Sequence, residues 1–542
     1  MIHNQPYFEC SPLPLEEQNQ KDSVLIVGAG LVGLTLALDL GMRGVKVTVL
    51  DEDDTVCDGS RAIVFARRSL EILARLGLGK RLLDKGVAWK KGTVYRKDVP
   101  LFENIIEEDS NQEYPLFLNI QQYYLEEWLV ESCLATNNVE IRWKHKVTNI
   151  HTEKDNVTLT VETPTGGYNV QCKWLLACDG AKSTIRRSLN LPFLGKVFKD
   201  RFLIVDIKMQ STIPAERFFW FSPSFHPEQS VLIHKQPDDV WRVDFQLGWD
   251  AEPEIELQPE RILVRLKKMF GENIELEIVW ASIYTFQCRR LEHFRHNRTI
   301  FVGDSAHQVS PFGGRGGNGG IQDADNLAWK IAAVLSGEAS ESLLDTYDSE
   351  RCLAADENIL NSTRSAEFIT PKSNRSFVYR NAVLALAKDY EFARKMVNSG
   401  RLSTPAKLTS SPLNFITDST DNEILPLGSP APDIPVLLNG NADWLLRHIG
   451  GQNFTLMVRA ENKNTQGETI ITLSAYPSLS DQAIKLVDKD NFLEIKYGIS
   501  PGGSMLFRPD QHLCAHIRNS SEKLIEKAYF CALGNAMQRS EM

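Results

Sequence analysis

The sequence has no excess of basic residues and no long hydrophobic run. Its 542 residues carry 60 Lys and Arg against 70 Asp and Glu, a formal net charge of −10. Because a nucleic-acid interface needs a basic patch, we expect no nucleic-acid partner. No apolar run reaches the roughly 18 residues that a membrane-spanning helix needs. Residues 1–22 also lack the basic start and apolar core of a signal peptide. We expect a cytoplasmic protein with no membrane partner.

Closely spaced cysteines are also missing. The nine cysteines are scattered, and none stands in a CxxC pair or at a metal-ligand spacing. An odd number of isolated cysteines is typical of reduced thiols in a cytosolic protein rather than of a disulfide framework. The sequence therefore predicts no metal site, and its 42% hydrophobic and 24% charged residues are ordinary for a globular protein.

A dinucleotide-binding fingerprint follows the first predicted strand, residues 24–27. Gly28, Gly30 and Gly33 form a GxGxxG turn before an Ala- and Leu-rich helix, and the next predicted strand ends at Asp51. Glycines let the backbone approach a pyrophosphate, the helix N-terminus favours its charge, and the acid accepts a hydrogen bond from a ribose hydroxyl. The pattern predicts a Rossmann-like βαβ unit that binds a dinucleotide.

A second glycine-rich stretch lies at residues 313–320, where six of eight residues are glycine. It follows a short buried strand, residues 299–302, and a Gly-Asp turn that contains Asp304. A helix is predicted to open near Gly320. The glycine density lets backbone N–H groups approach a ligand with a negative or electron-rich edge.

Between these motifs, residues 201–286 alternate as strands and are rich in aromatic side chains. Most of these aromatic residues are expected in the core of a sheet, but an aromatic face would also suit a planar substrate. His234 and Gln236 share one strand face, because side chains alternate with a period of two. Trp220 is a third candidate contact in the same segment.

Composition divides the chain into parts. These are an N-terminal arm (1–22), a nucleotide-binding domain with a helical extension (23–200 and 287–400), the sheet segment (201–286), a Ser/Thr/Pro-rich linker (401–427) and a second α/β unit (428–542). Within the last unit, a helix is predicted near residues 480–487.

Two further motifs accompany the fingerprint: CDGAKSTIR at residues 178–186 and GDSAHQVSPFGGRGGN at residues 303–318. Together they resemble the class A flavoprotein monooxygenases, the aromatic hydroxylases typified by para-hydroxybenzoate hydroxylase. The chain is most similar to the longer members, of the phenol hydroxylase and 3-(3-hydroxyphenyl)propionate hydroxylase type. The resemblance implies an α/β fold in which a Rossmann-like FAD-binding domain is interleaved with a mixed or antiparallel substrate-binding sheet. It also implies a C-terminal thioredoxin-like domain, residues 428–542, here without CxxC.

The resemblance implies FAD as the cofactor. The residues that match the family's FAD contacts are Gly28, Gly30, Gly33 and Asp51 on the ADP part, Arg61 near the pyrophosphate, Gln122 and Asp304 on the ribityl chain, Asp179 and Gly180 of the DG motif, Pro311 on the flavin's reactive face, and Gly314, Gly316, Gly317 and Asn318 at the ring edge. Two features depart from the usual pattern. Ser305 stands where alanine is usual, which we expect to be silent. Gly317 replaces the bulkier residue often found before the asparagine, and Arg315 adds a charge beside it.

The activity implied by the resemblance is NAD(P)H-dependent hydroxylation of a phenol or related aromatic ring. NADH or NADPH reduces FAD, O2 adds at the flavin C4a, and the hydroperoxide hydroxylates the ring, with Pro311 lining the reactive face. Trp220, His234 and Gln236 are the candidate substrate contacts, and His234 is a candidate base or proton relay. An ordinary strand histidine is the alternative. With one fingerprint in the chain, the nicotinamide is expected to bind without its own Rossmann domain, and a homodimer is left open.

The sequence leaves three further functions open. A flavin halogenase is expected to carry a WxWxIP segment, and the nearest stretch, FWFSP at residues 219–223, does not match. A flavin oxidoreductase that does not hydroxylate its substrate would share the same cofactor motifs. So would a flavin-binding module that has no catalytic activity.

Overall fold

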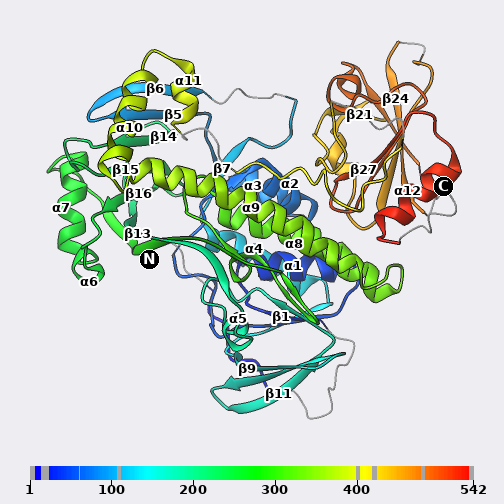
Figure 1. Ribbon diagram of the computed structural model, residues 1–542, viewed down its shortest axis with the longest axis horizontal. Helices are drawn as coiled ribbons and strands as arrows, with labels where there is room; N and C mark the ends of the chain where they lie inside the picture. The colour runs from blue at the N-terminus through cyan, green and yellow to red at the C-terminus, as the bar shows by residue number, and fades with distance from the viewer. Residues whose placement is uncertain are drawn as a thin grey trace.

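Figure 1 shows the protein as a computed structural model. It describes residues 6–13, 24–59, 61–105, 111–397, 403–417, 424–464, 467–477 and 483–535. The first three quarters of the chain are organised around two large sheets, and a third sheet forms a separate C-terminal unit (Figure 1).

The first sheet has the order β18-β19-β12-β1-β2-β8, and all neighbours are parallel except β18 and β19. Its strands are β1 (Val24–Val27), β2 (Val47–Leu50), β8 (Val139–Arg142), β12 (Trp174–Ala177), β18 (Arg295–His296) and β19 (Thr299–Phe301). Runs such as VLIV in β1 and WLLA in β12 are buried throughout, as expected for a parallel sheet covered on both faces. This is the Rossmann-like unit that the fingerprint predicted.

Long helices pack on this sheet. The principal ones are α1 (Leu31–Met42), α4 (Gln122–Ala135), α8 (Arg315–Ser336) and α9 (Leu343–Ile369). Helix α1 contacts both α4 and α8, and α9 runs beside α8 (Figure 1). Small accessory sheets are formed by β9 (Lys146–Thr152), β10 (Val157–Thr163) and β11 (Gly166–Cys172), and by β3 (Val64–Ala66), β7 (Phe117–Asn119) and β4 (Val87–Ala88). No helix in the described part of the chain is long and apolar enough to cross a membrane.

The second sheet has eight strands in the order β20-β17-β13-β16-β15-β14-β5-β6. They are β5 (Lys91–Arg96), β6 (Val99–Ile105), β13 (Phe193–Lys208), β14 (Arg217–Phe221), β15 (Ser230–Lys235), β16 (Val240–Leu247), β17 (Glu277–Leu291) and β20 (His307–Gln308). The sheet therefore takes in β5 and β6, which precede residue 201. One face packs with α7 (Pro259–Phe270) in an apolar core. Helices α10 (Asn374–Ala387) and α11 (Glu391–Met396) lie over the β5–β6 end (Figure 1).

The C-terminal unit is a seven-stranded sheet in the order β22-β21-β25-β24-β23-β26-β27, with every neighbouring pair antiparallel. Its elements are β21 (Pro435–Leu438), β22 (Asn441–Trp444), β23 (Phe454–Arg459), β24 (Thr469–Tyr476), β25 (Ile484–Asp488), β26 (Ser504–Phe507), β27 (Leu513–Ile517) and the closing helix α12 (Glu522–Ala532). The prediction of a helix near residues 480–487 is wrong where it can be compared, since IKLVD forms β25 and pairs with β24 and β21. The thioredoxin-like assignment stays a prediction.

Buried charges fasten this unit to the nucleotide-binding domain. Arg508, between β26 and β27, is fully buried, and its Nη1 lies 2.6 Å from Glu350 Oε1 of α9. Lys330 of α8 pairs with the other oxygen of Glu350 at 2.7 Å, and Arg508 also pairs with Asp510. The C-terminal unit is thus anchored to α9 and, through the shared Glu350, to α8, the helix that follows the second glycine-rich stretch.

Candidate active site

The GxGxxG turn between β1 and α1 leaves no room for side chains at its outer glycines. Gly28 has φ +107°, and a Cβ added there would lie 2.4 Å from the carbonyl oxygen of Cys178. A Cβ on Gly33 would lie 1.9 Å from the carbonyl oxygen of Gly28. Gly30 is more open, with Glu126 Oε1 at 3.7 Å. The turn therefore brings bare backbone to the N-terminus of α1.

Asp51 lies at the end of β2 beside this turn. Its Oδ2 accepts a hydrogen bond from the N–H of Ala29, and its Oδ1 accepts one from Asp53 N at 2.9 Å. Burial raises the pKa of Asp51 to about 6. A ribose hydroxyl that donates to this carboxylate would stabilise its charged form.

Glu126 of α4 is a buried carboxylate at the same place. Its Oε1 accepts hydrogen bonds from Leu31 N and Gln122 Nε2, both at 2.8 Å, and its Oε2 accepts one from Cys57 N at 2.8 Å. The helix N-terminus stabilises the negative charge. The sequence marks Glu126 only through its i, i+4 spacing from Gln122, and the structure shows that it joins α1 to the loop after β2.

Gln122 and Arg61 lie on the way from the ADP part towards the Gly-Asp turn. Gln122 Oε1 accepts a hydrogen bond from Ala62 N at 2.9 Å, which fixes the chain beside Arg61. Arg61 is exposed and near enough to Asp304 to favour the charged form of that carboxyl group. The structure therefore groups Arg61 with Asp304, 243 positions apart in the sequence.

The DG motif is held together internally and bonded to the Gly-Asp turn. Asp179 Oδ2 accepts a hydrogen bond from Ile185 N at 3.0 Å, while its Oδ1 is buried without a partner among the described residues. Gly180 takes the left-handed conformation, φ +70°. Arg186 Nη1 donates to the carbonyl oxygen of Ser305 at 2.8 Å. The two motifs form one structural unit.

The Gly-Asp turn is supported by Asp323 of α8. Asp323 accepts hydrogen bonds from Gly303 N at 3.1 Å, His307 Nε2 at 2.6 Å and Arg351 Nε at 2.6 Å. Burial opposes the charged form of Asp323, but the cationic partners outweigh burial and lower its pKa to about 2. Asp304 itself has a raised pKa, because burial outweighs nearby positive charge.

The helix after the glycine-rich loop begins at Arg315, five residues before the predicted start near Gly320. The glycines inside its first turns are needed for close packing. A Cβ on Gly320 would lie 2.4 Å from Val32 of α1, and one on Gly317 would lie 3.1 Å from Ala62. A Cβ on Gly316 would lie 3.9 Å from the Asp304 carboxylate. The first N–H groups of α8, which have no acceptor within the helix, thus lie beside the Gly-Asp turn.

Side chains at the start of α8 serve the fold. Asn318 Oδ1 accepts a hydrogen bond from Ala66 N at 2.9 Å, and its Nδ2 donates to Val64 O at 2.8 Å. Arg315 is buried and donates to Asn358 of α9 at 3.0 Å. Gly314, which precedes the helix, has φ +60°. Pro311 is exposed at the other end of this loop.

The hydroxyl group of Ser305 makes hydrogen bonds that an alanine could not make. Its hydroxyl group is fully buried, donates to Ala177 O at 2.5 Å and accepts from Val302 N at 3.2 Å. It therefore ties the end of β19 to the end of β12.

One face of the eight-stranded sheet carries a row of polar side chains. Arg217, His234, Arg242, Asp206 and Trp280 are register partners on β14, β15, β16, β13 and β17. Arg242 pairs with Asp206 at 2.8 and 2.7 Å. The four polar side chains span four strands, Trp280 ends the row on the fifth, and the apolar core lies on the opposite face.

Gln236 and His234 lie together on this polar face, as their spacing predicted. Gln236 Nε2 donates to Asp206 Oδ1 at 3.1 Å, whereas its Oε1 is buried without a partner among the described residues. His234 Nδ1 is also buried and unpartnered in the described part of the chain. Burial and the nearby Arg217 and Arg242 hold the pKa of His234 well below its ordinary value, so this histidine is neutral.

Asp244, two residues after Arg242 on the same face of β16, is a residue that the sequence reasoning missed. Its Oδ1 has no hydrogen-bond partner among the described residues. Burial raises the pKa of Asp244 to about 7, although Arg242 and Arg217 oppose the shift. A signal for it exists in the sequence: in WRVDFQL, charged residues alternate with apolar ones inside a strand.

Trp220 does not lie with His234. It pairs in register with Val231, on the apolar face, and its ring stacks with Tyr95 at 5.0 Å and meets Phe225 edge-on at 5.9 Å.

An aromatic group begins at Phe202, four residues away from Asp206 along β13. The ring of Phe312 packs edge-on against Phe202 and Phe286, both at 5.1 Å. At about 3.3 Å per residue, the polar row and this group are about 13 Å apart.

The residues present fit FAD. The turn at α1 offers bare backbone for a pyrophosphate, and Asp51 offers a ribose acceptor. The N-terminus of α8 offers N–H donors where reduced flavin carries charge. Pro311 and Phe312 connect this end to the polar and aromatic sheet face. In the part of the chain that the structure describes, no cluster of three or more His, Cys, Asp or Glu side chains could hold a metal ion.

Comparisons with known proteins agree with this geometry. Residues 21–362 match the family described as "FAD binding domain". The chain is 30% identical over 520 residues, 91% of this chain and 90% of the other, to a 6-methylpretetramide 4-monooxygenase from Streptomyces rimosus. It is 28% identical over 369 residues to a 3-(3-hydroxy-phenyl)propionate/3-hydroxycinnamic acid hydroxylase from Mycolicibacterium smegmatis, covering 67% of this chain but 64% of that protein.

The fold is shared with solved structures along almost the whole chain. The anhydrotetracycline hydroxylase from Streptomyces rimosus superposes with a TM-score of 0.72 at 24% identity, covering 94% of this chain and 99% of that one. None of these three relatives favours a halogenase or a non-catalytic module. The cofactor of this site is FAD, and the chain belongs to the FAD-binding-domain family of FAD-dependent aromatic monooxygenases.

Proposed function

We propose that this monooxygenase hydroxylates a phenolic ring on the polar face of the eight-stranded sheet, with NADH or NADPH and O2 as co-substrates. Bound FAD supplies the redox chemistry, transferring electrons from the nicotinamide to oxygen. The observation that carries the proposal is the set of buried, unpartnered polar atoms on His234, Gln236 and Asp244 among the described residues. Buried polar atoms are normally satisfied, so a ligand with hydroxyl groups is the natural partner for them.

Asp244 is proposed to accept the phenol proton. A phenol has an ordinary pKa near 10, and an acceptor whose pKa is about 7 suits proton transfer near neutral pH. Arg217 and Arg242 favour the phenolate that results, which makes the ring nucleophilic. His234 is proposed as a neutral relay rather than as the final holder of the proton, because its pKa is too low. Gln236 orients the substrate.

Pro311 is proposed to line the reactive face of the flavin, while Phe312, Phe202 and Phe286 exclude water from that end. Gly314, Gly316, Gly317 and Asn318 would present backbone to the ring edge. Asp304 would hold the ribityl chain. A relative named for 3-(3-hydroxy-phenyl)propionate and another named for 6-methylpretetramide support a phenolic ring.

The same proposal includes either NADH or NADPH as the co-substrate, a homodimeric assembly and a cytoplasmic location. Nine cysteines without disulfide partners suit a reducing compartment.

One assay tests the proposal. The purified protein should be yellow, with FAD released on denaturation, and a panel of phenols should stimulate NADH or NADPH oxidation with a hydroxylated product seen by mass spectrometry. Stimulated oxidation that yields only hydrogen peroxide with every phenol would contradict the hydroxylation.

A further inference from the structure

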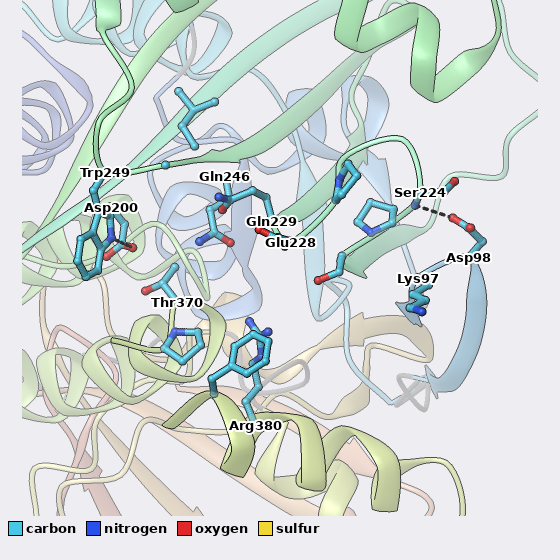
Figure 2. A pocket seen from close by; sticks show the side chains of 17 residues that line it. Lys97, Asp98, Asp200, Ser224, Glu228, Gln229, Gln246, Trp249, Thr370 and Arg380 are labelled. Carbon is cyan, nitrogen blue, oxygen red and sulfur yellow. Dashed lines mark hydrogen bonds between the residues drawn. The ribbon is translucent and has the colours of Figure 1, made fainter. Parts of the chain in front are cut away.

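A cavity of about 780 Å³ opens at the edge of the eight-stranded sheet, where β13, β14 and β16 meet the junction of α9 and α10 (Figure 2). The apolar part of its lining comprises Pro223, Leu247, Trp249, Pro371 and Phe377. A volume of this size accepts an organic molecule of one to several rings.

Arg380 projects from α10 into this cavity (Figure 2). Its side chain is only 5% exposed and lies over the rings of Phe377 at 4.9 Å and Phe221 at 5.8 Å. Nη1 donates to Ile369 O at 3.2 Å, but Nε is buried and has no hydrogen-bond partner among the described residues. No described carboxylate forms an ion pair with it.

The acids near the cavity do not neutralise Arg380. Asp200 pairs with Lys372 and accepts a hydrogen bond from Trp249 Nε1 at 3.1 Å. Asp98 and Glu228 are exposed at the rim, where water screens them. A second cation, Arg96, is close enough to Arg380 to add to the effect of burial in lowering its pKa. A buried, uncompensated cation is costly, and an anion in the cavity would relieve that cost.

The cavity lies next to the aromatic group at the predicted reactive end of the flavin. Gln246 lines it and stands next to Phe202 in the sheet register. The ring of Phe202 packs on Phe312, the neighbour of Pro311. A molecule whose ring reaches this aromatic group can therefore extend a substituent towards Arg380.

We propose that the cavity binds the anionic end of the aromatic substrate and that Arg380 pairs with its carboxylate. This rests on the proposed hydroxylase function and narrows its substrate class to aromatic acids. Arginine suits the role because its planar guanidinium group can bind a carboxylate through two hydrogen bonds.

Direct binding tests the assignment without turnover. The probes are 3-phenylpropanoate and its uncharged analogue 3-phenylpropanamide, titrated by calorimetry into the FAD-loaded protein with no nicotinamide present. The wild-type chain should prefer the carboxylate. Arg380→Gln should weaken carboxylate binding by about 10- to 100-fold, the range for a charge-assisted hydrogen bond, and should leave amide binding within about threefold. Arg375→Gln, which removes an exposed arginine from the same helix, is the matched control and should change neither.

Equal affinity of the wild-type chain for the two probes, or equal weakening of both by Arg380→Gln, would overturn the assignment. If Arg380→Gln does not fold, Arg380→Lys replaces it. It keeps the charge and loses the planar group, so it should reduce the preference for the carboxylate without abolishing it, and an unchanged preference would overturn the assignment. If the binding test fails but the protein still hydroxylates neutral phenols, only the aromatic-acid assignment is wrong. If the protein binds the acid but never hydroxylates a phenol, the hydroxylase proposal is wrong instead.

Discussion

Two carboxylates in this protein sit in opposite surroundings. Asp323 in α8 accepts hydrogen bonds from His307, Arg351 and the backbone of Gly303, and its pKa is lowered to about 2. Asp244 in β16 has an oxygen without a partner in the described structure, and its pKa is raised to about 7. The first supports the Gly-Asp turn of the FAD site, called here the cofactor cradle, and the second lies on the sheet face that is proposed to bind the substrate.

The contrast extends to the neighbours of each residue. Around Asp323 the protein supplies the hydrogen-bond donors itself, so this carboxylate is fully partnered before any ligand binds. On the sheet face, polar atoms of Gln236, His234 and Asp244 are buried without partners among the described residues. Unpaired buried groups are costly and persist mainly at functional sites. We therefore infer that Asp323 stabilises the cofactor cradle and that the polar atoms of the sheet face are kept for a ligand.

The largest expected effect comes from breaking the complete site. Asp323→Asn leaves Arg351 as a buried charge without its carboxylate and weakens the acceptor of His307, so the free energy of unfolding should fall by about 3 to 5 kcal/mol, measured by urea titration. The stabilisation from Asp323 is present above its unfolded pKa near 4 and is lost as the pH falls through about 2. Glu338→Gln, at an exposed position just beyond the end of the same helix, should stay within about 0.5 kcal/mol. A small loss of unfolding free energy in Asp323→Asn would contradict the contrast drawn between Asp323 and Asp244.

The next effect is on turnover. Asp244→Asn should lower kcat for a phenol by about 100-fold, the range for loss of a general base, with the FAD-to-protein absorbance ratio unchanged. Wild-type kcat should rise with pH through about 7, as Asp244 loses its proton. The control is Asp250→Asn, an exposed acid beyond the end of the same strand. Unaltered kcat in Asp244→Asn would assign the proton to another group.

The smallest effect concerns the cradle again. Ser305→Ala removes a buried hydroxyl group that donates to Ala177 O and accepts from Val302 N. The unfolding free energy should fall by about 1 to 2 kcal/mol, against no more than about 0.5 kcal/mol for exposed Ser336→Ala. Equal unfolding free energies of wild type and Ser305→Ala would agree instead with the expectation that the serine is silent.

The cradle could be predicted from the sequence because its signals are local. The spacing of Gly28, Gly33 and Asp51 predicts the βαβ unit. The structure shows that a side chain at either outer glycine would clash with a backbone oxygen. The predicted start of α8 is wrong because glycine suggests a loop. Here the glycines at 317 and 320 let a helix pack against Ala62 and Val32.

The sheet face was harder because it is assembled from distant strands. Strands β5 and β6 join it from before residue 201, and nothing local marks that pairing. Side-chain direction depends on strand parity, so Trp220 falls on the apolar face while His234 falls on the polar one. The helix predicted near residues 480–487 fails for a similar reason, since the short sequence IKLVD of β25 becomes a strand through the strands on either side of it.

The most direct test of the contrast is the free energy of unfolding of Asp244→Asn against wild type at pH 8. A raised folded-state pKa means that the wild-type chain loses stability as the pH rises from about 4 through about 7, because the buried carboxylate must then be charged. The asparagine variant has no such charge. It should therefore be more stable at pH 8, by roughly 2 to 4 kcal/mol. A variant less stable than wild type, as expected for Asp323→Asn, would contradict the conclusion that this face is kept unpaired for its substrate.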